Sequence, residues 1–259
     1  MCSFKRLVWV FGVLALGSLL GGCAPVGSPD GAVAERQTRL LTATRQLLLT
    51  PDRLTDWSPF ALPGKRFATF EPVISESVPA LRVRADDSVS ILRQRFAAPL
   101  SAGHRLSFQW KIDGLPTNAD LAVADRSDSP VGVLLAFDGD RSRWSARDHR
   151  MSELTRLLTG EELPYATLAY VWSHAAPVGT VVVNPRSGRI RKLVLDTGVS
   201  QVGLWRLHER DLQADFRLVF GEEPGPLQAV ALMTDTDNTR SRLTAWYGPM
   251  HMKAFQPAR

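Results

Sequence analysis

Oxygen-bearing side chains near the end of the chain have the clearest capacity for chemistry. Asp235, Asp237, Asn238 and Thr239 follow an apolar stretch that ends at Met233. Alternate residues of an extended segment point to the same side, so Asp235, Asp237 and Thr239 could present hard oxygen ligands to Ca²⁺. The alternative is that these side chains hydrogen-bond to the backbone of their own turn. The second interpretation is favoured, because short turns rich in Asp and Asn are common.

The same run begins like the loop of an EF-hand, but the pattern breaks where that loop depends on it. Arg240 stands where the sharp turn needs glycine, and Trp246 stands where the bidentate glutamate belongs. An EF-hand is therefore excluded. No cofactor is predicted, and a Ca²⁺ site of another kind would need oxygens from elsewhere in the chain.

A second charged group lies upstream, within a segment that predicts a helix. Asp211 and Asp215 are four residues apart, so a helix would place them on one face beside Arg210. If this helix packs near the acidic loop, Arg210 could pair with Asp235 or Asp237. Arginine–carboxylate networks of this kind are more often structural than catalytic, so Arg210, Asp211 and Asp215 are predicted to form a structural ion network.

Aromatic residues add a possible sugar-binding surface. Sugars stack on aromatic rings while carboxylates and amides bind their hydroxyls. Trp246 and Tyr247 adjoin the acidic loop, but neighbours in a strand face opposite sides, so only one of them can line a groove. Trp110 instead has the pattern of a core residue. The predicted ligand-binding residues are Trp172, Asp235, Asp237, Asn238, Trp246 and Tyr247.

The sequence lacks the features that would indicate several classes of function. The five histidines have no HExxH spacing, and the chain has no G-x-S-x-G, P-loop or dinucleotide-binding motif. A net charge of +5 without a dense basic patch makes nucleic acid a poor partner. A pair of distant carboxylates could still form the active site of a polysaccharide-active enzyme. Whether the protein is an enzyme therefore stays open, with a non-catalytic role favoured.

The N-terminus has the features of a targeting segment. Lys5 and Arg6 precede an apolar run over residues 7–20, which is short for a membrane span. The following Leu20–Cys23 resembles a bacterial lipobox, in which the cysteine carries the lipid. Because Ala24 follows that cysteine, the resemblance implies an outer-membrane lipoprotein of a Gram-negative bacterium, facing the periplasm. The only other cysteine, Cys2, would be removed, so no disulfide is expected.

The remaining chain predicts one mainly β domain. The expected parts are a signal peptide over residues 1–22, a tether with an amphipathic helix over 23–54, and a β-sandwich over 55–256. Alternating apolar and polar residues, as in 105–112, predict antiparallel strands of a sandwich or jelly roll. Two interruptions are expected: a short helix over 152–158, within an insertion over 142–163, and a helix over 205–220. The strands are expected near residues 67–73, 80–85, 89–96, 105–112, 130–137, 165–172, 179–183, 190–195, 229–233 and 243–247.

Several blocks of the chain resemble a bacterial family known as domain of unknown function 3047, from about Trp57 to Lys253. The resemblance implies an exported jelly-roll or galactose-binding-like sandwich, and the last two blocks also resemble carbohydrate-binding modules. Pro249 departs from the pattern, which has an Asp after the glycine. The blocks are Phe108–Ile112, Asp128–Pro130, Tyr170–Ser173, Gly179-Thr180, Asn184-Pro185, Arg210-Asp211 with Asp215, Phe220-Gly221, Met233–Thr239 and Ala245–Gly248.

These observations favour an envelope lipoprotein that binds carbohydrate or cell-envelope glycan without catalysis. Its expected partners are the membrane, through the lipid on Cys23, and a glycan. The alternatives are a polysaccharide lyase or hydrolase, and a purely structural envelope lipoprotein.

Overall fold

A computed structural model describes residues 47–49, 51–100 and 104–254. These residues belong to one compact unit, Thr44–Arg259. The predicted signal peptide, Cys23 and most of the predicted tether lie outside the described residues. Within the described part of the chain, no helix has both the length and the apolar character needed to span a bilayer.

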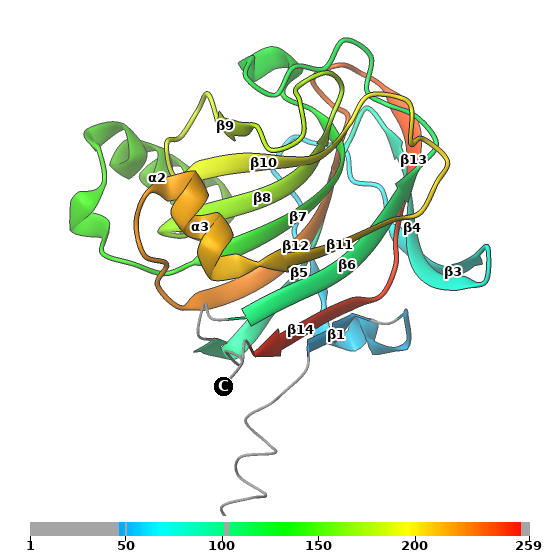
Figure 1. The fold of residues 1–259 in the computed structure, drawn as a ribbon. Helices are drawn as coiled ribbons and strands as arrows, with labels where there is room; N and C mark the ends of the chain where they lie inside the picture. The colour runs from blue at the N-terminus through cyan, green and yellow to red at the C-terminus, as the bar shows by residue number, and fades with distance from the viewer. Residues whose placement is uncertain (1–46, 50, 101–103, 255–259) are drawn as a thin grey trace, which may run out of the picture. The chain divides into compact units, whose positions relative to one another are not determined.

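Two seven-stranded sheets form the described structure, and both are visible in Figure 1. The first sheet has the order β1-β14-β6-β13-β4-β3, and β11 pairs with β6 beside this path. All of its pairs are antiparallel. Its strands are β1 (Leu47–Leu49), β3 (Phe70–Ser75), β4 (Val78–Asp86), β6 (His104–Ile112), β11 (Arg206–Asp211), β13 (Arg242–Tyr247) and β14 (Met250–Ala254).

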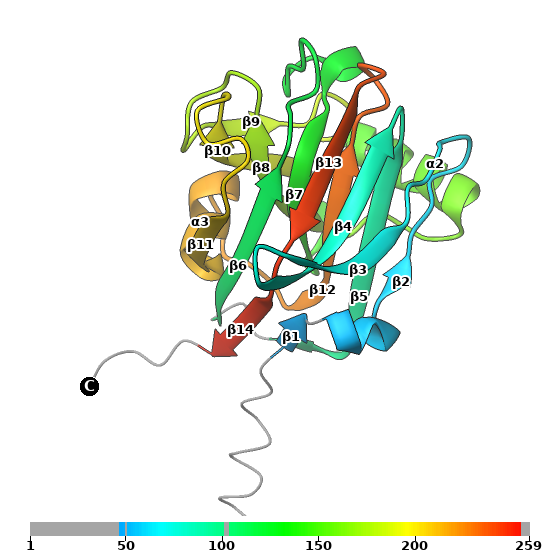
Figure 2. The same ribbon diagram turned by 90° about the vertical axis from the view of Figure 1, so that its right-hand side faces the viewer.

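The second sheet has the order β2-β5-β12-β7-β8-β10-β9. It is antiparallel except for β8 and β10, which run parallel. Figure 2 shows β6, β13 and β4 in front of β7, β12 and β5, so the two sheets lie face to face. The strands of the second sheet are β2 (Ser58–Pro59), β5 (Val89–Leu100), β7 (Ser129–Phe137), β8 (Ala166–Ser173), β9 (Val181–Val183), β10 (Ile190–Thr197) and β12 (Leu227–Asp235).

The main core lies between the two sheets and follows the alternation of their strands. In β6, Leu106, Phe108, Trp110 and Ile112 are all fully buried, as their spacing predicts. They join inward side chains of the second sheet, such as Leu135 of β7, in one apolar cluster. The fold class predicted from the sequence is confirmed: a mainly β sandwich of two sheets with two helices.

The helix α3 (Leu212–Phe220) covers the core at one side of the sandwich, beside β10, β6 and β11. Leu212, Phe216 and Val219 point from it into the main core. The preceding residues Arg206–Asp211, predicted as the first half of this helix, form β11 instead. The prediction was therefore right for the second half of the segment and wrong for the first.

The helix α2 (Ala146–Thr159) belongs to the predicted insertion and begins earlier than the sequence analysis expected. Ser145 is its N-terminal cap, and Gly160 ends it in the left-handed conformation at φ 78°. Short 3₁₀ helices complete the described structure: η1 (Pro51–Asp56), η2 (Ala124–Arg126) and η3 (Arg141–Arg143).

The strand β1 differs from the amphipathic helix expected within residues 23–54. Leu47–Leu49 pair with Met250–Met252 of β14, so the end of that segment belongs to the first sheet. The earlier part of the expected helix lies outside the described residues.

A β-bulge in β10 directs the carboxylate of Asp196 toward the interior of the sandwich. The register with β8 shifts between Val194 and Asp196, so that Asp196 faces Trp172 in the pairing. The shift turns the Asp196 side chain inward, where it accepts a hydrogen bond from the Trp110 indole at 2.7 Å.

Candidate functional site

Two of the predicted ligand-binding aromatics lie in the core. Trp172 has no exposed surface, and its indole nitrogen donates to the Gly198 carbonyl at 3.1 Å. Tyr247 is 2 % exposed, and its hydroxyl lies 2.8 Å from the Thr234 hydroxyl. Neither side chain can line a surface groove, so the structure contradicts these two assignments. Both residues help to fill the space between the sheets.

Trp246 lies on the outer face of the first sheet, where it forms a small group with two other residues. The Lys111 ammonium lies 4.7 Å from the centre of the Trp246 ring and 5.3 Å from that of Trp205. Distances of this size are typical of cation–π contacts. Trp205, Lys111 and Trp246 are called the aromatic platform below.

The aromatic platform is held in place by hydrogen bonds and by strand pairing. Lys111 is only 6 % exposed, and its ammonium donates to the Ser75 hydroxyl at 2.8 Å and to the Glu76 carboxylate at 2.9 Å. Trp246 pairs across the sheet with Lys111 of β6 on one side and with Arg82 of β4 on the other. The platform therefore combines two partly open aromatic residues with fixed polar groups around them.

The predicted acidic loop meets a third carboxylate from a distant part of the chain. Oxygens of Asp128, Asp235 and Asp237 all lie within 4.8 Å of one another. These three residues are called the acidic cluster below. Asp128 comes just before β7, and no local motif in the sequence joins it to the loop after β12.

Asp128 also holds the loop after β12 in its conformation. Its two oxygens accept hydrogen bonds from the backbone and side chain of Asn238 and from the backbone and side chain of Thr239. Asp128 is 1 % exposed, so these bonds are shielded from water. The turn is thus capped by a carboxylate 110 residues earlier in the chain. Asn238, a predicted ligand-binding residue, is engaged in this contact.

Two lysines accompany the acidic cluster. Lys65 forms an ion pair with Asp237, and its own side chain is half-exposed. Lys192 is buried, and its ammonium donates to the Ser127 carbonyl at 3.0 Å and to the Ser127 hydroxyl at 2.7 Å. Burial lowers the pKa of Lys192 to about 8, although Asp235 and Asp128 act in the opposite direction.

Asp235 is the least satisfied member of the acidic cluster. Its Oδ1 atom is buried and has no hydrogen-bond partner among the described residues. Burial, together with the negative charges of Asp128 and Asp237, raises the pKa of Asp235 well above its usual value. The unpaired carboxylate is therefore costly in its ionised form unless a positive charge accompanies it.

The predicted ion network around Arg210 lies elsewhere. The Arg210 guanidinium donates to Asp215 at 2.8 Å, and the Tyr170 hydroxyl donates to the same carboxylate at 2.7 Å. The hydrogen bond with Asp215 raises the pKa of Arg210. Asp211 caps the N-terminus of α3 by accepting from the backbone of Gln213 and Ala214. The expected pairing of Arg210 with Asp235 or Asp237 is therefore wrong, since its carboxylate partner is Asp215.

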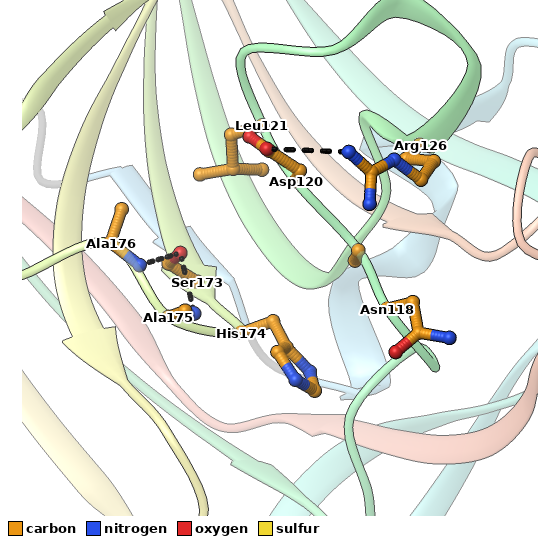
Figure 3. A pocket seen from close by; sticks show the side chains of 9 residues that line it. Asn118, Asp120, Leu121, Arg126, Ser173, His174, Ala175 and Ala176 are labelled. Atoms are coloured by element: carbon orange, nitrogen blue, oxygen red, sulfur yellow. Dashed lines mark hydrogen bonds and ion pairs between the residues drawn. The ribbon is translucent and has the colours of Figure 1, made fainter.

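A separate pocket opens between the loop before β7 and the loop after β8 (Figure 3). Its volume is about 480 Å³. Asp120 and Arg126 form an ion pair on one side of it, with the His174 ring on the other. The Nδ1 atom of His174 is buried without a hydrogen-bond partner among the described residues. Neither Trp172 nor Trp246 lines this pocket, and no motif in the sequence indicates it.

The fold and these sites define a β-sandwich protein with polar and aromatic groups on its surface. The family model "Protein of unknown function (DUF3047)" matches residues 55–251, and the chain belongs to this family. The resemblance noted in the sequence is thereby confirmed. No curated protein matches the chain.

Solved structures show distant similarity to carbohydrate-binding modules and glycoside hydrolases. The family 11 carbohydrate-binding module of Lic26A-Cel5E from Clostridium thermocellum is 8 % identical, with a TM-score of 0.41 over 83 % of this chain and 98 % of that one. Endoglucanase 3 of family GH12 from Trichoderma harzianum is 8 % identical, with a TM-score of 0.41 over 82 % of this chain and 98 % of that one. The xylan-binding module CBM86 from Roseburia intestinalis is 8 % identical, with a TM-score of 0.31 over 81 % and 96 %.

Proposed function

We propose that this protein is a non-catalytic glycan-binding lipoprotein of the cell envelope. The observation that carries the glycan part is the aromatic platform. Trp205 and Trp246 offer ring surface for the apolar faces of sugars, and the exposed carboxylate of Glu76 offers an acceptor for hydroxyls. Because Lys111 is held by Ser75 and Glu76, the platform needs little rearrangement to bind a ligand.

Substitution of Trp246 by alanine tests this assignment. Isothermal titration against a panel of bacterial and plant polysaccharides should first identify a ligand of the wild-type protein. Trp246→Ala should then bind it at least roughly tenfold more weakly, because a stacking surface is lost. Trp246→Phe, which keeps a ring, should retain most of the affinity.

The matched control for this titration is Leu218→Ala, which also removes an exposed apolar side chain but lies on helix α3 and is not part of the platform. This variant should bind as the wild type does. A panel without any binding partner, or equal affinities for Trp246→Ala and Leu218→Ala, would remove the support for glycan binding at the platform.

The alternative of a polysaccharide-active enzyme depends on the acidic cluster, which brings carboxylates as close as a retaining glycosidase requires. Its residues are poorly placed for that chemistry. The Oδ1 atom of Asp235 is buried, and Asp237 is paired with Lys65. We therefore favour binding over catalysis. Release of reducing ends or unsaturated uronates, abolished in Asp235→Asn, would reverse this preference.

The membrane anchor is a proposal from the sequence alone. Lipid on Cys23 would hold the domain at the periplasmic face of the outer membrane. In a Gram-negative host grown with labelled palmitate, the wild-type protein should carry the label and sediment with outer membranes. Cys23→Ser should lose both properties, whereas Cys2→Ser should keep both, because residue 2 lies within the proposed signal peptide. Labelled Cys23→Ser protein would contradict the assignment.

A further inference from the structure

We propose that the acidic cluster of Asp128, Asp235 and Asp237 is a binding site for a divalent cation, best suited to Ca²⁺. This site goes beyond the glycan-binding function proposed above and shares no residue with the aromatic platform. Either proposal can therefore fail without affecting the other.

The spacing of the three carboxylates fits an ion of this size. Their oxygens lie within 4.8 Å of one another. Ca²⁺ binds oxygen at 2.3–2.6 Å, so two oxygens on opposite sides of the ion are about 4.6–5.2 Å apart. An ion placed among the three side chains would therefore need only small adjustments of their positions.

An unpartnered oxygen gives independent support. The Oδ1 atom of Asp235 is buried, and no donor among the described residues reaches it. The nearby ammonium of Lys192 donates to both oxygens of Ser127, and it makes no hydrogen bond to the Oδ1 atom of Asp235. A buried carboxylate oxygen without a donor is costly, and a cation would supply the missing partner.

The negative charge of the acidic cluster also favours binding of a divalent cation. With all three carboxylates ionised and Lys192 charged, two negative charges are in excess, and one divalent cation would neutralise them by favouring the ionised form of Asp235 that its surroundings otherwise disfavour. Lys65 compensates part of this excess through Asp237, but its side chain is half-exposed. A bound ion could therefore displace it into water at little cost.

The types of ligand favour Ca²⁺ over other metals. The cluster offers carboxylate oxygens and contains neither histidine nor cysteine, the usual ligands of zinc and copper. Asp128 is already oriented by donors from Asn238 and Thr239, as ligating carboxylates commonly are. Ca²⁺ also tolerates irregular geometry better than Mg²⁺, which demands a near-ideal octahedron.

Titration of the full-length protein with CaCl₂, after removal of metals with EDTA, tests the site. Isothermal titration should show one Ca²⁺ bound per chain, with weaker binding of Mg²⁺, and Ca²⁺ should raise the melting temperature. Asp235→Asn should weaken Ca²⁺ binding at least tenfold. The control Asp125→Asn changes a highly exposed aspartate outside the cluster and should bind as the wild type does. If Asp235→Asn does not fold, Asp237→Asn provides the same test.

Lys65→Ala distinguishes a cation site from a network of ion pairs alone. Loss of the competing ammonium should raise the affinity for Ca²⁺ several-fold, because Asp237 becomes free to bind the ion. In a pure ion-pair network, this variant would gain no Ca²⁺ binding. The proposal is overturned if the wild type shows no binding heat and no melting shift at millimolar Ca²⁺, or if Asp235→Asn and Asp125→Asn bind equally.

Discussion

Replacement of Asp196 by alanine is expected to lower the free energy of unfolding by about 3–5 kcal/mol. The Asp196 carboxylate is 3 % exposed and accepts from the indole of Trp110 at 2.7 Å. It also accepts from the Arg206 guanidinium at 2.9 Å and lies 2.8 Å from the His208 ring nitrogen. Alanine would leave a buried indole donor and two polar side chains without their common acceptor. Urea denaturation followed by circular dichroism measures the loss.

The control is Asp125→Ala, which removes an exposed carboxylate and should change the free energy of unfolding by less than about 0.5 kcal/mol. A loss of less than about 1 kcal/mol for Asp196→Ala would show that the carboxylate contributes little more than an ordinary neutral hydrogen bond.

The contribution of Asp196 should also depend on pH. Burial tends to raise the pKa of Asp196, but hydrogen bonds from His208 and Trp110 outweigh it, so the pKa lies below the ordinary value of 3.8. The folded state therefore binds the proton less tightly than the unfolded state. The stabilisation is present above about pH 4 and is lost as the pH falls through the lowered pKa. The difference in stability between wild type and Asp196→Ala should accordingly shrink between pH 6 and pH 3.

Trp172→Ala should lower the free energy of unfolding by about 3–5 kcal/mol, the usual cost of emptying a large buried aromatic site. The Trp172 side chain has no exposed surface and packs in the core between the sheets. Trp246→Ala on the outer face should cost much less, so the two tryptophans make a matched pair. Chemical denaturation of both variants under the same conditions provides the comparison.

The same pair separates a core role for Trp172 from the groove role predicted from the sequence. With a core role, Trp172→Ala loses stability, and any remaining folded protein keeps its affinity for the ligand. Unchanged stability together with weakened ligand binding would instead restore Trp172 to the binding surface.

The sequence predicts the strands well wherever one face alone is buried. The alternation in β6 identified Leu106, Phe108, Trp110 and Ile112 as core residues, and all four are buried. In β8 all eight residues are buried. A strand covered on both sides has no alternation to reveal which face a side chain takes. The position of Trp172 was therefore not predictable from its own strand.

The prediction of a helix over 205–220 was wrong for the first half of the segment, and the reason is different. In β11, the half-buried residues Arg206, His208 and Arg210 are polar, so the segment lacks the apolar alternation of an ordinary strand. Their partners are Asp196 of β10 and Asp215 of α3. Because Asp196 lies on the preceding strand, which belongs to the other sheet, this charge compensation depends on the folded structure and is not visible in the local sequence pattern.

The candidate site was predictable only in part. The sequence identified Asp235, Asp237 and Trp246 as chemically capable residues, and each lies within one of the two groups described here. The sequence-based prediction assigned these three residues to one site because they are close in the chain. Strand β13 separates them in space, since the acidic loop precedes the strand and Trp246 lies on its outer face. Asp128 and Lys111 come from distant segments, and no local spacing connects them to their partners.

The pairing of β1 with β14 constrains when the domain can fold. β14 lies between β1 and β6, so β1 gains its partner only after residues 250–254 have been synthesised. Met250 and Met252 of β14 are also buried in the core. During synthesis, a chain that has not yet reached β14 leaves part of β6 unpaired and the core open on that side. The first sheet therefore becomes complete only once β14 has been synthesised, because this strand joins the two ends of the described chain.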